Sequence, residues 1–308
     1  MNKDKSEGNV IKAKHDDIAL ENNSKSDSNT TEIAKSNVIP NGAKEDNISP
    51  QFLKLVKRFA IDGALLPEAQ QMLIEDRTSK RVRLNQLRKQ QNIENIMQKT
   101  LGYCSDFEIA QNTDLDWFTR YIALSEDVSN PTMQDLWAKI LAGELTNPGS
   151  YSYKALKVFR DMSIYDAKLL AKACSLAVKD PNKKGIRLIS GAYQKPGLLN
   201  LFSKERQFFC NLSHYGLSYA DLLVLAENNL IFLQENESRL MEKGDVLPFS
   251  YNGLALKLIA SKANISLQFY KFTPIGAELA HLITDKVNRE FFEHLKAMLS
   301  HYFTIQVD

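Results

Sequence analysis

The densest group of side chains able to do chemistry is a run of cations between residues 77 and 89. The segment RTSKRVRLNQLRK contains six basic residues and no acid: Arg77, Lys80, Arg81, Arg83, Arg88 and Lys89. If this segment is helical, cations three or four residues apart lie on neighbouring turns of one face. The face is then either solvated or paired with acids elsewhere in the chain, or it binds a nucleic acid or an acidic protein.

Carboxylates at four positions are the next candidates, because paired carboxylates can act as general acid and base. Glu126 and Asp127 end one expected helix, and Asp135 and Glu144 lie on the next. No nucleophile lies near them in the sequence, and the glycines form no phosphate-binding loop. Acids near a helix start are explained by the helix dipole. We therefore expect no catalytic residue here, and we expect that the protein is not an enzyme.

Histidines and cysteines give no metal pattern. His294 and His301 are seven residues apart and His281 lies further upstream, without acids at a repeating interval. We expect these histidines at the surface or in an interface, with no bound metal and no cofactor. The three cysteines are far apart and form no CxxC pair, which excludes a zinc ribbon and a thioredoxin-like site. We expect them to be buried or half-buried thiols.

Composition sets the class of protein. The chain has 308 residues with 44% apolar and 25% charged residues and a formal charge of +2. These values are ordinary for a globular protein and exclude collagen-like, disulfide-scaffold and fully disordered chains. Because the N-terminus lacks the apolar core of a signal peptide and no segment is apolar enough to span a membrane, we expect a soluble, cytoplasmic protein without a membrane partner. The abundant Asn, Lys and Ile are typical of an AT-rich bacterial genome.

The first 49 residues differ from the rest. They hold seven lysines and nine acids, many Asn and Ser, and very few large apolar residues. Such a segment buries too little apolar surface to offset its chain entropy, so we predict a disordered tail over residues 1–49. The remaining residues carry a net charge of +4, which is concentrated in the basic run.

Residues 50–180 are expected to form a helical domain, because apolar residues recur there at helical spacing. Thr113 or Asp114, Pro131 and the pair Ser163/Asp166 mark helix starts. The expected helices cover residues 51–60, 67–99, 113–127, 131–145, 150–162 and 163–178. The basic run lies on the second and longest of them.

Residues 181–308 mix strand and helix patterns. Strands are predicted at 185–190, 231–233, 254–261, 265–273 and 303–307, and helices at 203–215, 218–228, 273–283 and 291–299. Helix, strand, strand pair and closing helix is the order of a winged-helix module. The predicted fold is therefore mainly α with a small β component: a helical N-terminal half followed by a winged-helix-like α+β module.

Two sequence blocks carry a resemblance to known families. The block LWAKILAGEL and the TPIG-EL start of a late helix resemble an uncharacterised bacterial family known as a domain of unknown function, over about residues 67–285. A weaker similarity links residues 136–142 and 162–170 to the abortive-infection alpha proteins. The latter family is associated with exclusion of phage, so the similarity implies a role in phage defence. Neither resemblance implies catalytic residues.

Three functions follow as hypotheses. The first is a non-enzymatic binding or regulatory protein that acts through contacts with a protein partner or a second copy, in phage defence. The alternative is a DNA-binding regulator that uses the basic helix Arg77–Lys89 and the winged-helix-like module. The helix expected to enter a DNA groove carries Asp221 and Glu227 and no cation, which argues against direct base reading there. The third is an enzyme of unrecognised type.

Overall fold

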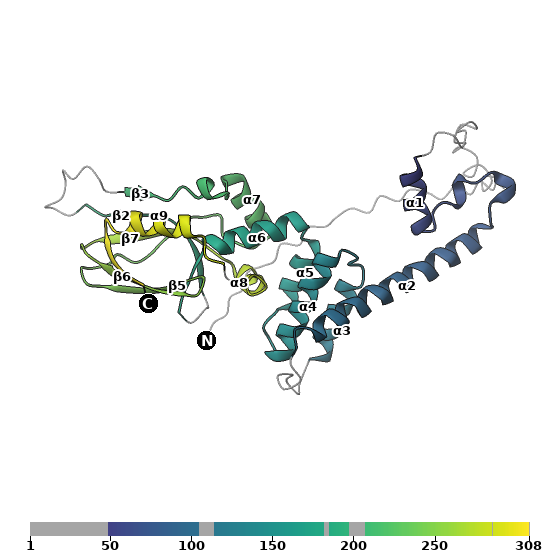
Figure 1. Cartoon of the computed structure of the whole chain (residues 1–308), viewed down its shortest axis with the longest axis horizontal. Coiled ribbons are helices and arrows are strands. Elements are labelled where there is room, and N and C mark those ends of the chain that lie inside the picture. Colours follow the sequence, from purple (N-terminus) through teal and green to yellow (C-terminus); the bar gives the residue numbers. More distant parts are fainter. Residues whose placement is uncertain (1–48, 105–113, 182–184, 197–206, 285, 308) are drawn as a thin grey trace, which may run out of the picture. The chain divides into compact units, whose positions relative to one another are not determined.

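The computed structural model describes residues 49–104, 114–181, 185–196, 207–284 and 286–307. By its internal contacts the chain divides into two units, Met1–Arg58 and Phe59–Asp308. The described part of the first unit is helix α1 (Pro50–Arg58), which matches the predicted helix at 51–60. The tail predicted over residues 1–49 lies, apart from Ser49, outside the described residues. The second unit contains the other elements (Figure 1).

Helices dominate the first part of the second unit. In chain order they are the short 3₁₀ turns η2 (Gly63–Leu65) and η3 (Glu68–Gln70) and helices α2 (Ile74–Leu101), α3 (Leu115–Ser125), α4 (Pro131–Thr146), α5 (Tyr153–Asp161) and α6 (Ile164–Leu176). The predicted start of α2 at Pro67 is wrong, because the chain there forms η3 and then extends before Ile74. The other predicted helices of this region are confirmed.

Local signals set the helix ends. The Asp114 carboxylate accepts hydrogen bonds from the first free amides of α3, and Asn130 does the same for α4 ahead of Pro131. Ser163 and Asp166 form the reciprocal capping box of α6. Each cap satisfies amides that have no partner within the helix.

Aromatic packing holds the helices together. The ring of Trp137 lies edge-on to Tyr121 at 5.3 Å and to Phe159 at 5.2 Å, and all three side chains are buried. The Tyr121 hydroxyl donates to the carbonyl of Trp137, and the Trp117 indole donates to the carbonyl of Tyr151. The LWAKILAGEL block, which contains Trp137, therefore serves packing.

The second part of the unit is built on an antiparallel sheet. Its strands are β1 (Val178–Lys179), β2 (Ile186–Gln194), β3 (Gln207–Phe209), β4 (Asn236–Glu237), β5 (Val246–Tyr251), β6 (Leu254–Ala260), β7 (Ile265–Lys271) and β8 (Phe303–Val307). Among the described residues the order is β4-β7-β2-β1-β5-β6-β8, and β3 pairs with β2. Turn η4 (Leu212–Tyr215) and helices α7 (Tyr219–Glu227), α8 (Pro274–Ala280) and α9 (Arg289–Leu299) accompany the sheet.

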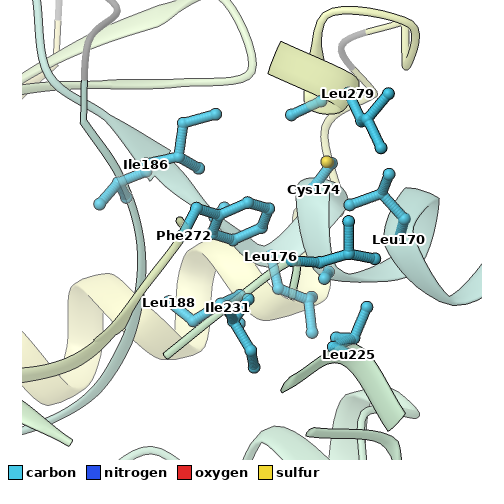
Figure 2. Close-up of a cluster of buried hydrophobic side chains, with 14 of the residues drawn as sticks. Leu170, Cys174, Leu176, Ile186, Leu188, Leu225, Ile231, Phe272 and Leu279 are labelled. Atoms are coloured by element: carbon cyan, nitrogen blue, oxygen red, sulfur yellow. The ribbon is translucent and has the colours of Figure 1, made fainter. Parts of the chain in front are cut away.

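One apolar core joins α6, α7 and α8 to the sheet. Figure 2 shows Leu170 and Cys174 of α6 close to Leu279 of α8, with Leu225 of α7 beneath them. Thr273 caps α8 ahead of Pro274. A side chain at Gly276 would meet the carbonyl oxygen of Leu230 at 1.9 Å, so glycine in the TPIG sequence lets α8 pack directly on backbone.

Two sequence predictions in this region are wrong. The described part of the predicted helix 203–215 is strand β3 followed by η4, because backbone pairing with β2 overrides the local pattern. The predicted strand 231–233 is reduced to one bridge between Ile231 and Phe272. Strand β5 was not predicted, although Asn252 and Gly253 mark a hairpin turn after it: both have positive φ.

The β component is larger than predicted, and the fold is mixed α/β. The predicted strand pair of the winged-helix order, strands 254–261 and 265–273, corresponds to β6 and β7, and these strands do not pair with each other. Strand β6 lies between β5 and β8, and β7 lies between β2 and β4. The structure thus does not confirm a winged-helix-like module. The division at residue 180 stays a prediction.

Candidate functional site

The basic run lies on α2, and most of it falls on one face of that helix. Residues 77, 80, 81, 84, 87 and 88 follow helical spacing and form a single stripe, with Arg83 and Lys89 off it. We call this set the α2 stripe: Arg77, Lys80, Arg81, Leu84, Leu87 and Arg88. In the stripe two leucines lie between three cations on one side and Arg88 on the other, and the leucines are exposed: 38% for Leu84 and 56% for Leu87.

Burial divides α2 into two halves. Every buried residue of the helix lies in its second half: Asn92, Ile96 and Thr100. That half packs against α4. Residues 74–91, which include the stripe, contain no buried residue. The stripe is therefore not required to complete the core.

The cations of the basic run differ in their partners. The Lys89 ammonium lies 2.5 Å from a carboxylate oxygen of Glu126 and 3.5 Å from Asp127. The hydrogen bond to Glu126, supported by both negative charges, raises the pKa of Lys89. In the described part of the chain, no acid lies within ion-pair distance of Lys80, Arg81 or Arg83. The expectation of a face paired with acids is thus met at Lys89, which lies off the stripe.

The two ends of the stripe contact the segment that precedes α2. The Arg88 guanidinium lies 4.7 Å from the ring centre of Phe59 and donates to the Asn85 side chain. Arg77 packs against Gly63 and, with Arg81, lines a cavity of about 270 Å³ whose other walls include Ile61. The buried Nε of Arg77 donates to no acceptor in the described structure. This end of the stripe offers a small apolar recess beside two arginines.

Large apolar side chains also lie exposed around the N-terminal end of α2. They include Ile61, Leu65, Leu66, Met72, Leu73, Ile74 and Val82, each at least 41% exposed. These side chains were not predicted from the sequence to be exposed. The sequence signal for their exposure is that a helix without a continuous apolar face has too few apolar residues to pack on both sides.

The carboxylates considered for catalysis have structural partners. Glu126 and Asp127 hold Lys89. Asp135 accepts a hydrogen bond from the Tyr103 hydroxyl, which lowers the pKa of its carboxyl group together with Lys139 and Lys99.

Glu144 is buried, and it accepts hydrogen bonds from the backbone amides of Gly149 and Tyr151. It therefore shapes the loop after α4. None of the four carboxylates is brought next to a nucleophile by these contacts.

His294 and His301 contact different residues. His294 forms a 2.5 Å hydrogen bond with the Tyr215 hydroxyl, and His301 stacks on Phe208 at 4.2 Å. Both are exposed, as is His281 at the end of α8, as predicted. Among the described residues, no three His, Cys, Asp or Glu side chains are grouped so that they could hold a metal ion.

The thiols of Cys174 and Cys210 are buried and that of Cys104 is half-buried, as predicted. Burial raises the pKa of Cys210 to about 11, so this thiol stays protonated at neutral pH and is a poor nucleophile. None of the helices in the described ranges combines the length and apolar character needed to cross a membrane.

A comparison with protein families identifies the family to which this chain belongs. A family model described as protein of unknown function (DUF2806) matches residues 76–296, from the first turn of α2 to the last turn of α9. The chain is a DUF2806 protein. The resemblance to a domain of unknown function is thereby confirmed. No curated protein and no solved structure matches this DUF2806 protein. The similarity to the abortive-infection alpha proteins stays a prediction.

The α2 stripe lies within the DUF2806 match. Chemically, it offers guanidinium and ammonium groups for carboxylates or phosphates, and leucines for an apolar partner. The stripe is therefore equipped for binding.

Proposed function

We propose that this DUF2806 protein is a non-enzymatic binding protein that holds an acidic, partly apolar protein segment against the α2 stripe. The observation that carries the proposal is the stripe itself: Leu84 and Leu87 are exposed between cations, and the described structure supplies no acid for Lys80 or Arg81. Exposed apolar residues grouped with charges are typical of protein interaction sites.

The leucines favour a protein over a nucleic acid. Phosphate groups interact favourably with the cations only. Burying Leu84 or Leu87 against a DNA backbone contributes little binding free energy. A helix in a partner protein can cover the leucines and bring carboxylates to the rim. The alternative of a DNA-binding regulator, using the basic helix and a winged-helix-like module, is weakened further by α7, where Asp221 serves as a cap.

Charge complementarity selects the chemistry of the partner. A second copy of this chain that docks face to face would bring Lys80 and Arg81 against the same cations, which costs free energy. An acidic partner gains from both the leucines and the cations. The proposed link to phage defence, in which this binding would be the regulated step, is supported by the abortive-infection similarity alone.

The test uses fluorescence anisotropy with the full chain and a labelled synthetic helix that carries leucines on one face and glutamates beside them. We expect binding, with an affinity loss of about tenfold or more in Leu84→Ser/Leu87→Ser and in Lys80→Glu/Arg81→Glu. The matched controls are Leu115→Ser, whose side chain is 76% exposed on α3, and Lys154→Glu/Lys168→Glu, both exposed on other helices. These controls should bind like the unmodified protein.

Four outcomes overturn the proposal. In the first, no peptide binds. In the second, a glutamate peptide with serine in place of leucine binds as tightly. In the third, a random DNA duplex binds and the leucine variant does not weaken this binding. In the fourth, sedimentation shows a dimer that the leucine variant dissociates, which assigns the stripe to a second copy.

A further inference from the structure

A small cavity lies at the N-terminal end of α2, where the α2 stripe begins. Its volume is about 270 Å³, and its described walls come from residues 60–64 and from the start of the helix. The polar side chains among them are Arg77, Thr78 and Arg81, and the other lining residues are apolar or glycine. Small-molecule sites usually measure about 300–1,000 Å³, so this volume suits the end of a single side chain.

The cavity wall carries two positive charges that the described structure does not neutralise. Arg77 and Arg81 are four residues apart, so they lie on neighbouring turns of one face of α2. In the parts of the chain that the structure describes, no acid lies within ion-pair distance of either guanidinium. The acids nearest in the sequence are Asp62, Glu75 and Asp76, and none of them lines the cavity.

The side chain of Arg77 also has a hydrogen-bond donor to spare. Its Nε is buried and donates to no acceptor among the described residues. Buried donors are normally paired, because leaving one unpaired costs free energy. A Cβ at Gly63 would lie 2.5 Å from Cδ of Arg77, so the glycine lets the arginine side chain lie close to the backbone. The guanidinium is thus held in the cavity wall with donors available to a ligand.

The donor set determines which ligand fits. A guanidinium donates two parallel hydrogen bonds to the oxygens of a carboxylate or a phosphate, and clusters of arginines commonly bind acidic and phosphorylated side chains. Thr78 adds a hydroxyl that can donate a further hydrogen bond. Ile61 and Ile74, at 51% and 59% exposed, give the cavity an apolar rim that can cover the stem of such a side chain.

We propose that this cavity, the Arg77–Arg81 pocket, binds one oxyanion group, a carboxylate or a phosphate, at the end of a side chain. That this side chain belongs to the acidic segment docked on the α2 stripe rests on the proposed function. At a rise of about 1.5 Å per residue, Arg81 lies about 4.5 Å from Leu84 along the helix axis. An acidic residue one or two turns from the apolar contacts of the segment therefore reaches the pocket and fixes the register of docking.

The experiment is isothermal titration calorimetry of the full chain with three short probes: N-acetyl-phosphoserine amide, N-acetylglutamate amide and the neutral N-acetylserine amide. We expect at least one acidic probe to bind with a Kd of about 5 mM or tighter and the neutral probe to bind more weakly by about tenfold or more. The tighter of the two acidic probes identifies the group as phosphate or carboxylate. Arg77→Gln should weaken that probe about tenfold.

The matched control is Arg83→Gln, which removes the same charge from the same helix at a position that does not line the pocket. It should bind the probe like the unmodified protein. The proposal is overturned if neither acidic probe reaches the stated affinity, or if Arg77→Gln weakens binding no more than Arg83→Gln. Should circular dichroism show that Arg77→Gln is unfolded, Ala64→Trp decides in its place, because a large side chain at this exposed lining position should block the probe.

The short probes carry no leucine, so they separate the pocket from the proposed function. Leu84→Ser/Leu87→Ser should bind them like the unmodified protein. If an acidic probe binds in the pocket but the amphipathic helix does not bind, the pocket stands and the proposed function fails. If the helix binds and neither acidic probe does, the proposed function stands and the pocket is overturned.

Discussion

The two halves of α2 belong to one continuous helix, but they differ in burial. In the second half, Asn92, Ile96 and Thr100 are buried against neighbouring helices, and Lys89, just before it, pairs with Glu126. In the first half, leucines and cations are exposed and no residue is buried. The comparison shows that apolar content alone does not distinguish a packing face from an exposed face. What distinguishes them is whether another element of the chain covers the face.

The largest expected effect comes from a matched pair of apolar truncations. Ile96 is fully buried, so Ile96→Ala should lower the free energy of unfolding by about 3 kcal/mol, through lost burial and the cavity left behind. Leu87 is 56% exposed, so Leu87→Ala should change it by less than about 0.5 kcal/mol. Urea denaturation measures both. Equal losses would mean that the first half also belongs to the folded core.

A second pair tests the polar anchor between the halves. The Asn92 amide donates to the carbonyl of Glu126 at 2.8 Å and to the hydroxyl of Ser129 at 3.2 Å. Asn92→Ala should cost about 1–2 kcal/mol, because it removes both hydrogen bonds that this buried amide donates. The neighbouring Gln91→Ala, at an exposed position, serves as the control and should be nearly neutral. If Asn92→Ala leaves the free energy of unfolding unchanged, these hydrogen bonds do not stabilise the packing of α2.

The smallest effect concerns the cations. Lys89→Gln should cost about 0.5 kcal/mol at neutral pH, whereas Arg83→Gln, without a described acidic partner, should cost less. Because the folded state raises the pKa of Lys89 above its ordinary value of 10.5, the stabilisation is present below that value. It is lost as the pH rises through the raised pKa. As the pH rises from neutral, the free energies of unfolding of the unmodified protein and of Lys89→Gln should converge. A difference between them that persists above the raised pKa of Lys89 would contradict the ion pair.

Local signals in the sequence predict the helices well. The capping pairs Ser163/Asp166 and Ser218/Asp221 and the Thr273 cap are short-range contacts, so residue spacing alone identifies them. The start of α2 could not be placed in this way, because Pro67 suits the first turn of a helix but here precedes a 3₁₀ turn.

The sheet could be predicted less well. Strand order depends on pairing between distant segments, such as β2 with β7 and β6 with β8. The β5–β6 hairpin carries a local turn signal at Asn252–Gly253, although strand β5 was not predicted from it.

The candidate site also has features that the sequence predicts and features that it does not. The spacing of residues 77 to 88 predicts a common helical face, but the partners of Lys89 come from α3 and its end, which only tertiary structure brings near. A cavity of about 720 Å³ that is lined by Lys139, Tyr151 and Leu282 also depends on tertiary structure, because its walls come from α4 and from the residues that follow α8. Sequence patterns therefore identify faces, and the fold determines which of them are covered.

Hydrogen exchange along α2 tests the central claim most directly. Mass spectrometry of the full chain, with and without the acidic amphipathic peptide, compares residues 74–91 with residues 92–101. Amides of the second half should be protected in both samples, and those of the first half should exchange faster alone and become protected when the peptide binds. If the peptide leaves exchange in residues 74–91 unchanged, the first half of α2 is not the docking surface.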